Sequence, residues 1–240
     1  MRGGIVPDGR AAGGAAILSA VTSPRSQPTT TWNDAGTALR RLLEAVRAEA
    51  EDGRPLIVGI TGPVGSGKTS LAARLLAPVR GTLLSTDHYL PDYDSLPEHE
   101  RDDPRHADLP LLAEHLAALR RAEPIDRPVW SFHSHSRVGV ERVEPAPLIA
   151  CEGIFALHPA VRAAIDLAVF VDAPAGVRWR RWERLEVSGE RGWGVEHARR
   201  YFATVAEPTF DRYAEAYKAS ADLVVINDGD SAGGPSQDEM

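Results

Sequence analysis

The chain has 240 residues and a net charge of −7, from 27 Lys and Arg against 34 Asp and Glu. This acidic balance argues against general nucleic-acid binding, which needs a basic surface. Cys151 is the only cysteine, which excludes an internal disulfide framework and a cysteine-cluster zinc site and fits a reducing cytoplasm. No apolar stretch approaches the roughly 20 residues that span a bilayer, so we expect no membrane partner.

The chain divides into a central domain and two polar ends. Residues 1–30 are rich in Gly, Ala, Ser, Thr and Pro without a sustained period, which predicts a disordered leader. A domain is expected over 31–227, starting with a helix that Asn33 or Asp34 caps and that runs to about residue 50. The apolar run 56–60 predicts a buried strand, and residues 228–240 predict a disordered tail.

The segment directly after that first buried strand has the spacing of a Walker A phosphate-binding loop. Glycines allow successive backbone N–H groups to turn inward around a phosphate, and the helix that follows adds its positive end. The lysine reaches the β- and γ-phosphates, and the threonine hydroxyl can ligate Mg²⁺. The sequence therefore predicts an ATP-type triphosphate site at Gly62, Pro63, Val64, Gly65, Ser66, Gly67, Lys68, Thr69 and Ser70.

The rest of the chain alternates short apolar strands with helices. Strands are expected at 82–85, 148–151, 167–171 and 223–226, and helices at 68–76, at 109–121 and in three stretches between 174 and 219. Residues 88–108 form a long loop, and 129–132 and 138–143 form a small β element outside the main sheet. This pattern predicts an α/β fold of the P-loop NTPase type, with a mostly parallel sheet and helices on both faces.

Charged side chains follow the carboxyl ends of these strands, where ligands of such sheets bind. Asp87 follows the second strand and can accept a proton from a hydroxyl, while Glu152 ends the third and can hold Mg²⁺. Arg181, Arg184 and Arg191 fall on an expected lid over about 178–200. A lid of this kind neutralises a transferring phosphoryl group and excludes water.

Several motifs together resemble one family. The segment 128–137 (PVWSFHSHSR) resembles the substrate strand of uridine–cytidine kinases, and Asp102-Asp103-Pro104 resembles their Asp-His-Pro element. Segments 85–89, 151–154, 170–172 and 190–192 also look like family motifs in the family's order. From this similarity over about 56–227, the chain is identified as a member of the uridine kinase/phosphoribulokinase group.

The resemblance implies ATP- and Mg²⁺-dependent phosphorylation of the 5′-hydroxyl of a pyrimidine nucleoside, in a family whose members are often homo-oligomers. It implies a catalytic set of Asp87, Lys68, Arg184 and Arg191, and a metal site at Thr69 and Glu152. The substrate contacts that it implies are Asp87, Tyr89, Asp102, Trp130, Phe132, His135, Arg181 and Tyr201.

Three departures from the family pattern concern the nucleobase. Trp130 stands for the family's tyrosine, Tyr201 for its glutamine, and Trp193 for the arginine after Arg191-Gly192. The lid also carries two extra residues between Arg184 and Arg191. Loss of a hydrogen-bonding amide matters because polar pockets discriminate through groups left unpaired. Two alternatives thus stay open: a kinase of another small alcohol, such as a modified nucleoside, a sugar phosphate or a pantothenate-like metabolite, and a nucleotide-dependent switch or ATPase.

Overall fold

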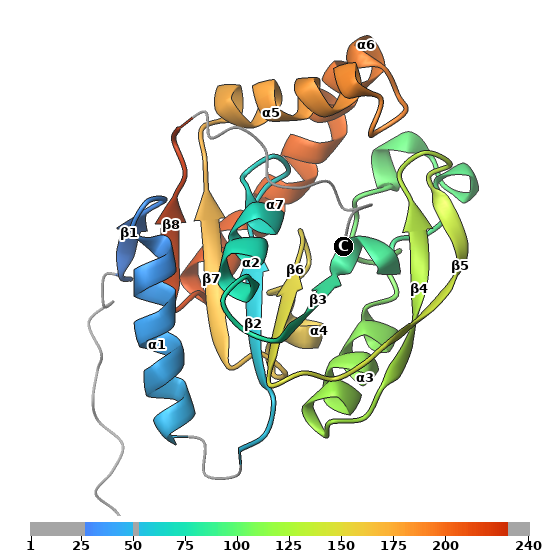
Figure 1. The fold of residues 1–240 in the computed structure, drawn as a ribbon. Coiled ribbons are helices and arrows are strands. Elements are labelled where there is room, and N and C mark those ends of the chain that lie inside the picture. Colours follow the sequence, from blue (N-terminus) through green and yellow to red (C-terminus); the bar gives the residue numbers. More distant parts are fainter. Residues whose placement is uncertain (1–26, 50–52, 230–240) are drawn as a thin grey trace, which may run out of the picture.

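The computed structural model describes residues 27–49 and 53–229, so most of the predicted leader and tail lies outside the described residues. Its centre is a six-stranded parallel sheet in the order β1-β8-β7-β2-β6-β3 (Figure 1). A separate antiparallel pair, β4 and β5, stands beside it. The strands are β1 Thr29–Thr31, β2 Leu56–Thr61, β3 Gly81–Ser85, β4 Ile125–Ser131, β5 Ser136–Val143, β6 Leu148–Glu152, β7 Leu167–Asp172 and β8 Leu223–Ile226.

Helices cover both faces of the sheet because side chains alternate along each strand. Leu56, Val58 and Ile60 of β2 pack with α1 and α2, whereas Ile57 belongs to the core with α3, α4 and α7. The predicted α/β architecture is confirmed. The helices are α1 Ala35–Glu49, α2 Lys68–Leu76, α3 Leu109–Arg120, α4 Pro159–Arg162, α5 Ala175–Ser188, α6 Val195–Tyr201 and α7 Glu207–Ala219, with a π-helical turn at Phe202–Ala206 between the last two.

The sheet has one strand that the sequence did not predict. Residues 29–31 were assigned to the leader and its boundary, but they form β1, which pairs in parallel with Val224–Ile226 of β8. The backbone N–H of Trp32 extends this pairing by donating to Ile226 O at 2.9 Å. Three consecutive threonines are β-branched and suit an edge strand, yet they carry no apolar alternation that would reveal one.

The carboxyl ends of the sheet strands are bordered by the last helices above them and by the antiparallel pair β4 and β5 at one side. Figure 1 shows α5 and α6 lying across the top of the sheet, with β4 and β5 at the side next to β3. The loop between β3 and α3 contains three short 3₁₀ turns, Thr86–Tyr89, Tyr93–Ser95 and Glu98–Glu100. None of the helices in the described part of the chain combines the length and apolarity needed to cross a membrane.

Candidate active site

The loop between β2 and α2 forms a phosphate cradle whose glycines are required by close packing. Gly65 has φ +73°, and a Cβ there would lie 2.5 Å from the carbonyl oxygen of Arg178. At Gly62 a Cβ would lie 2.2 Å from the carbonyl oxygen of Val171. The buried Ser66 hydroxyl has no hydrogen-bond partner among the described residues, and such a group in a ring of N–H donors fits a phosphate oxygen.

Four ionisable side chains meet at this cradle. Lys68 Nζ donates to Pro63 O at 3.0 Å, and burial lowers the pKa of Lys68 against the opposing charges of Glu152 and Asp87. Burial raises the pKa of Asp87, while Arg191 and Lys68 lower it. Burial and then Asp87 raise the pKa of Glu152 to about 7. Two carboxylates and two cations thus lie in one poorly solvated site.

Strand register explains why the carboxylates converge. Ser85, the last residue of β3, is opposite Glu152, the last residue of β6, and Asp87 follows two residues later with its N–H bonded to Ser85 Oγ. The Thr69 hydroxyl donates to Glu152 Oε2 at 3.2 Å. Thr69 and Glu152 offer the oxygen ligands that Mg²⁺ prefers, and phosphate oxygens and water complete such a shell. In the described ranges, no three His, Cys, Asp or Glu side chains form a metal site by themselves.

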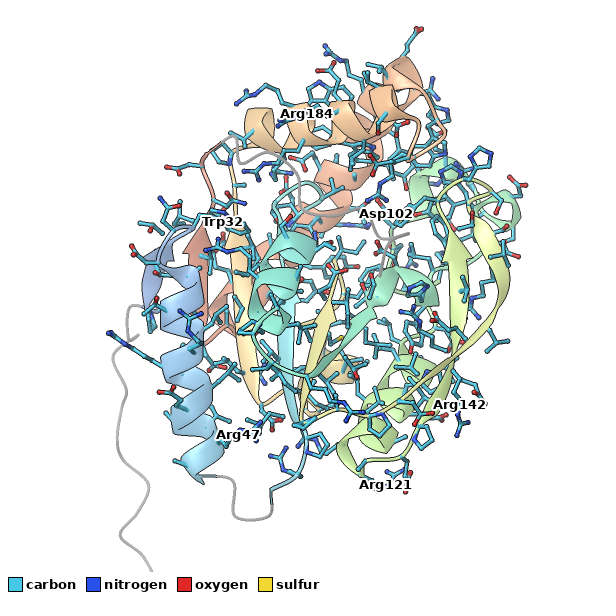
Figure 2. All side chains as sticks on the ribbon, viewed as in Figure 1. Trp32, Arg47, Asp102, Arg121, Arg142 and Arg184 are labelled. Carbon is cyan, nitrogen blue, oxygen red and sulfur yellow. The ribbon has the colours of Figure 1, made fainter. Side chains whose placement is uncertain are left out.

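A second polar group faces this site from the loop before α3. The hydroxyl of Tyr93 donates a hydrogen bond to Asp102 Oδ1 at 3.0 Å. The hydroxyl of Tyr201 on α6 is a further neighbour of the same carboxylate. Burial raises the pKa of Asp102 to about 6, with the two tyrosines acting in the opposite direction. Figure 2 places Asp102 between the lid and β4. Its carboxylate can accept hydrogen bonds from hydroxyl groups of a ligand.

Aromatic rings from two separate parts of the chain close the upper wall. His135, in the turn between β4 and β5, stacks on Trp193 of the lid with ring centroids 4.6 Å apart and planes at 15°. Tyr93 stacks on His135 at 5.9 Å and lies 6.2 Å from Trp193, so the three rings contact one another in a cluster. Trp193 also contacts Tyr201, at 4.4 Å. Trp130 is 95% shielded and its indole N–H donates to Pro91 O at 3.1 Å, which fixes its position.

The turn between α5 and α6 carries Arg191 into the site. The Arg191 guanidinium lies 3.6 Å from the centroid of Phe132, and it is the cation that lowers the pKa of Asp87 most. Buried Glu186 holds this turn, because its Oε2 accepts from the N–H groups of Trp193 and Gly194 at 3.1 and 3.0 Å. The role of Glu186 was not predicted from the sequence. The available signal was its position four residues after Trp182, whose indole N–H donates to its Oε1 at 2.9 Å.

Three predicted site residues lie elsewhere in the structure. Arg181 donates to Gly65 O at 3.0 Å and to Asn227 Oδ1 at 2.9 Å, so it supports the backbone of the phosphate cradle. Arg184 is exposed on top of α5, where its Nε donates to Arg180 O (Figure 2). Tyr89 is fully buried, and its hydroxyl forms a hydrogen bond with Nδ1 of His115 on α3 at 2.7 Å.

The arrangement can therefore hold a triphosphate and a divalent cation beside a carboxylate with a raised pKa. A hydroxyl placed between Asp87 and the outermost phosphate would be within reach of a base and of two cations, Lys68 and Arg191. Of the predicted residues, the structure brings together those of the phosphate loop with Asp87, Asp102, Glu152, Phe132 and Arg191.

Comparisons with known proteins show which family this chain belongs to. A sequence profile of the Phosphoribulokinase / Uridine kinase family matches residues 57–231. The uridine kinase of Ligilactobacillus salivarius is 30% identical over 190 residues, covering 75% of this chain and 89% of that protein. The uridine kinase of a Geobacillus species is 35% identical over 186 residues, covering 73% and 88%.

Solved structures show the same fold. A putative fructose transport system kinase from Silicibacter superposes with a TM-score of 0.62 at 19% identity, covering 79% of this chain and 98% of that one. A possible uridine kinase from Bacillus stearothermophilus gives a TM-score of 0.60 at 18% identity, with coverage of 80% and 98%.

Proposed function

The chain belongs to the Phosphoribulokinase / Uridine kinase family and is a phosphotransferase that acts on a hydroxyl group, and we propose that its phosphoryl donor is ATP. The first candidate acceptor is the 5′-hydroxyl of uridine, cytidine or a related nucleoside. The observation that carries this proposal is the position of Asp87, whose carboxylate interacts with both Lys68 of the phosphate cradle and Arg191 of the lid.

In this proposal each side chain has a defined part. Asp87 takes the proton of the attacking hydroxyl, and its raised pKa suits a base that works near neutral pH. Lys68 and Arg191 stabilise the charge that spreads over the transferring phosphoryl group. Thr69 and Glu152 would hold Mg²⁺, which supplies positive charge at the phosphate oxygens when bound. Asp102 would hold acceptor hydroxyls.

A second candidate is a kinase of another small alcohol. The packing of Trp193 on His135 and Tyr201, called the aromatic closure below, favours it. Trp193 covers the face of His135 that a planar base would otherwise contact, and Tyr201 is 1% exposed beneath it. A ring in this position leaves less room for a nucleobase than an arginine side chain that can turn aside. We expect a smaller or differently shaped alcohol to be accepted if pyrimidine nucleosides are not.

An ADP-release assay with ATP and Mg²⁺ across uridine, cytidine, modified nucleosides, sugar phosphates and pantothenate decides between the two. Turnover of uridine or cytidine supports the first candidate, and turnover of another alcohol alone supports the second. ADP release that is slow and independent of every acceptor would contradict both.

The aromatic closure gives a prediction for Trp193. Trp193→Ala should raise kcat/KM for uridine roughly tenfold, the size of effect expected from one additional apolar contact in a substrate pocket. The reason is that the substitution uncovers the ring of His135, on which the base could then pack. The control is Trp179→Ala, which removes a lid tryptophan that packs on Phe202 outside this wall. Unchanged or poorer uridine kinetics in Trp193→Ala, with the KM for ATP unchanged, would contradict the assignment of this pocket.

The raised pKa of Asp102 predicts a pH dependence of acceptor binding. The groups that face this carboxylate are Tyr93, Tyr201, Asp87 and Arg101. Its pKa of about 6 means that it is ionised at higher pH and can then accept hydrogen bonds from an acceptor. Below that pH it is protonated, so we expect the acceptor KM to rise about tenfold per pH unit.

The check is the acceptor KM between pH 5 and 8 at saturating ATP, measured in the wild type and in Asp102→Asn. The variant should have a high acceptor KM that does not change with pH. A wild-type acceptor KM that stays constant from pH 7 to pH 5 would contradict the role of Asp102.

A further inference from the structure

The sheet order sets the direction in which a bound triphosphate runs. Glu152 ends β6 and Asp87 follows β3, and both strands lie on one side of β2, while β7, β8 and β1 lie on the other side. The outermost phosphate must point toward Asp87 if it is to be transferred. The nucleoside end of the same molecule therefore leaves the cradle on the side of β8 and β1.

One aromatic side chain lies at that exit. Trp32 follows β1, and its six-membered ring approaches the phosphate loop so closely that a Cβ on Gly67 would be 3.4 Å from it. Figure 2 shows Trp32 at the upper end of β8, on the opposite side of the sheet end from Asp102. Asn227, directly after β8, fixes the neighbouring backbone by donating from Nδ2 to Ser66 O at 2.7 Å.

Trp32 is held in place but only partly buried. Its N–H continues the pairing with β8, and its carbonyl accepts from Arg74 Nη1 at 3.0 Å. The Arg74 guanidinium lies 5.0 Å from the ring centroid, which orients the indole from one direction. A partly exposed, fixed aromatic ring beside a phosphate cradle is a surface on which a flat base can stack.

We infer that Trp32 forms an aromatic wall for the nucleobase of the phosphoryl donor, supplied by a segment that precedes the part of the chain matched by the family profile, 57–231. This inference rests on the proposed use of a nucleoside triphosphate. It makes β1 and Trp32 part of the nucleotide site, and it explains why the three-residue strand at the sheet edge is followed by a tryptophan at the cradle.

The experiment compares binding of MgATP and of magnesium tripolyphosphate, which lacks the nucleoside, by calorimetry. The variants are Trp32→Leu, which keeps apolar packing but removes the aromatic face, and Trp32→Phe, which keeps a ring. In Trp32→Leu the Kd for MgATP should rise about tenfold, the size of one lost base–aromatic stack. Its Kd for tripolyphosphate should stay unchanged, and Trp32→Phe should remain within about threefold of the wild type.

The other outcomes separate this inference from the proposed function. If Trp32→Leu binds MgATP as the wild type does, or loses affinity for both ligands equally, Trp32 is a packing residue and the inference fails. If the wild type binds tripolyphosphate as tightly as MgATP, no wall for the base exists although the phosphate site holds. If the wild type binds neither, the proposed nucleotide site fails and the inference fails with it.

Discussion

Asp87→Asn should lower turnover about 10²–10⁴-fold, the range expected when a general base is removed. The amide cannot take the proton of the attacking hydroxyl, yet it keeps the shape of the side chain. MgATP binding should persist, because the cradle backbone, Lys68 and Thr69 are unaltered. Removing one buried negative charge beside Lys68 also reduces the repulsion of the bound triphosphate.

The measurement is single-turnover phosphoryl transfer together with the Kd of MgATP, in the wild type and in two variants. Asp94→Asn is the matched control, since it changes an exposed aspartate in the same long loop and should leave turnover unchanged. Near-normal turnover in Asp87→Asn would remove Asp87 from the role of base. Loss of MgATP binding in that variant would show that its effect is structural.

The sheet and the carboxylate ends were predictable because they depend on local patterns. Strands such as Ile149–Cys151 are continuous apolar runs, which is what burial on both faces of a parallel sheet demands. The residue at the end of such a run must reach the sheet edge, so Glu152 could be placed from the sequence alone. The same reasoning placed Asp87 after β3, the strand next to β6 in the sheet.

The stacking of Trp193 on His135 could not be predicted in this way, because it joins side chains that are distant in the sequence. The stacking of Trp193 on His135 depends on a lid turn whose backbone N–H groups Glu186 binds, and on a left-handed backbone at His135, with φ +51°. Neither feature has a periodicity. The hydrogen bond of Tyr89 could not be predicted for a similar reason: its partner, His115, lies on a helix 26 residues later.

The arginines of the lid show the limit of helical spacing. Arg181 and Arg184 were expected on one face because they are three residues apart, which separates them by about 60° around the axis. That angle is enough to matter at the edge of a buried face. Arg181 reaches the phosphate loop and Asn227, whereas Arg184 lies on the exposed side of α5.

Lys68→Ala should lower MgATP affinity roughly 10²–10³-fold, as expected when one partner of a buried charge cluster is removed. Lys68 is buried between Asp87 and Glu152, whose charges both oppose the lowering of its pKa. Without its ammonium group, the carboxylates and the triphosphate would face one another with less positive charge between them. Turnover should fall further than affinity, because the same cation stabilises the charge on the transferring phosphoryl group.

Two measurements make this result specific: calorimetric binding of MgATP and turnover at saturating acceptor, in Lys68→Ala and Lys68→Arg. Arginine keeps the charge but is a planar fork that cannot donate from the compact position of Nζ next to Pro63 O. We expect Lys68→Arg to recover part of the binding and little of the turnover. Wild-type MgATP affinity in Lys68→Ala would mean that the triphosphate is held elsewhere, and the cradle would lose its assigned role.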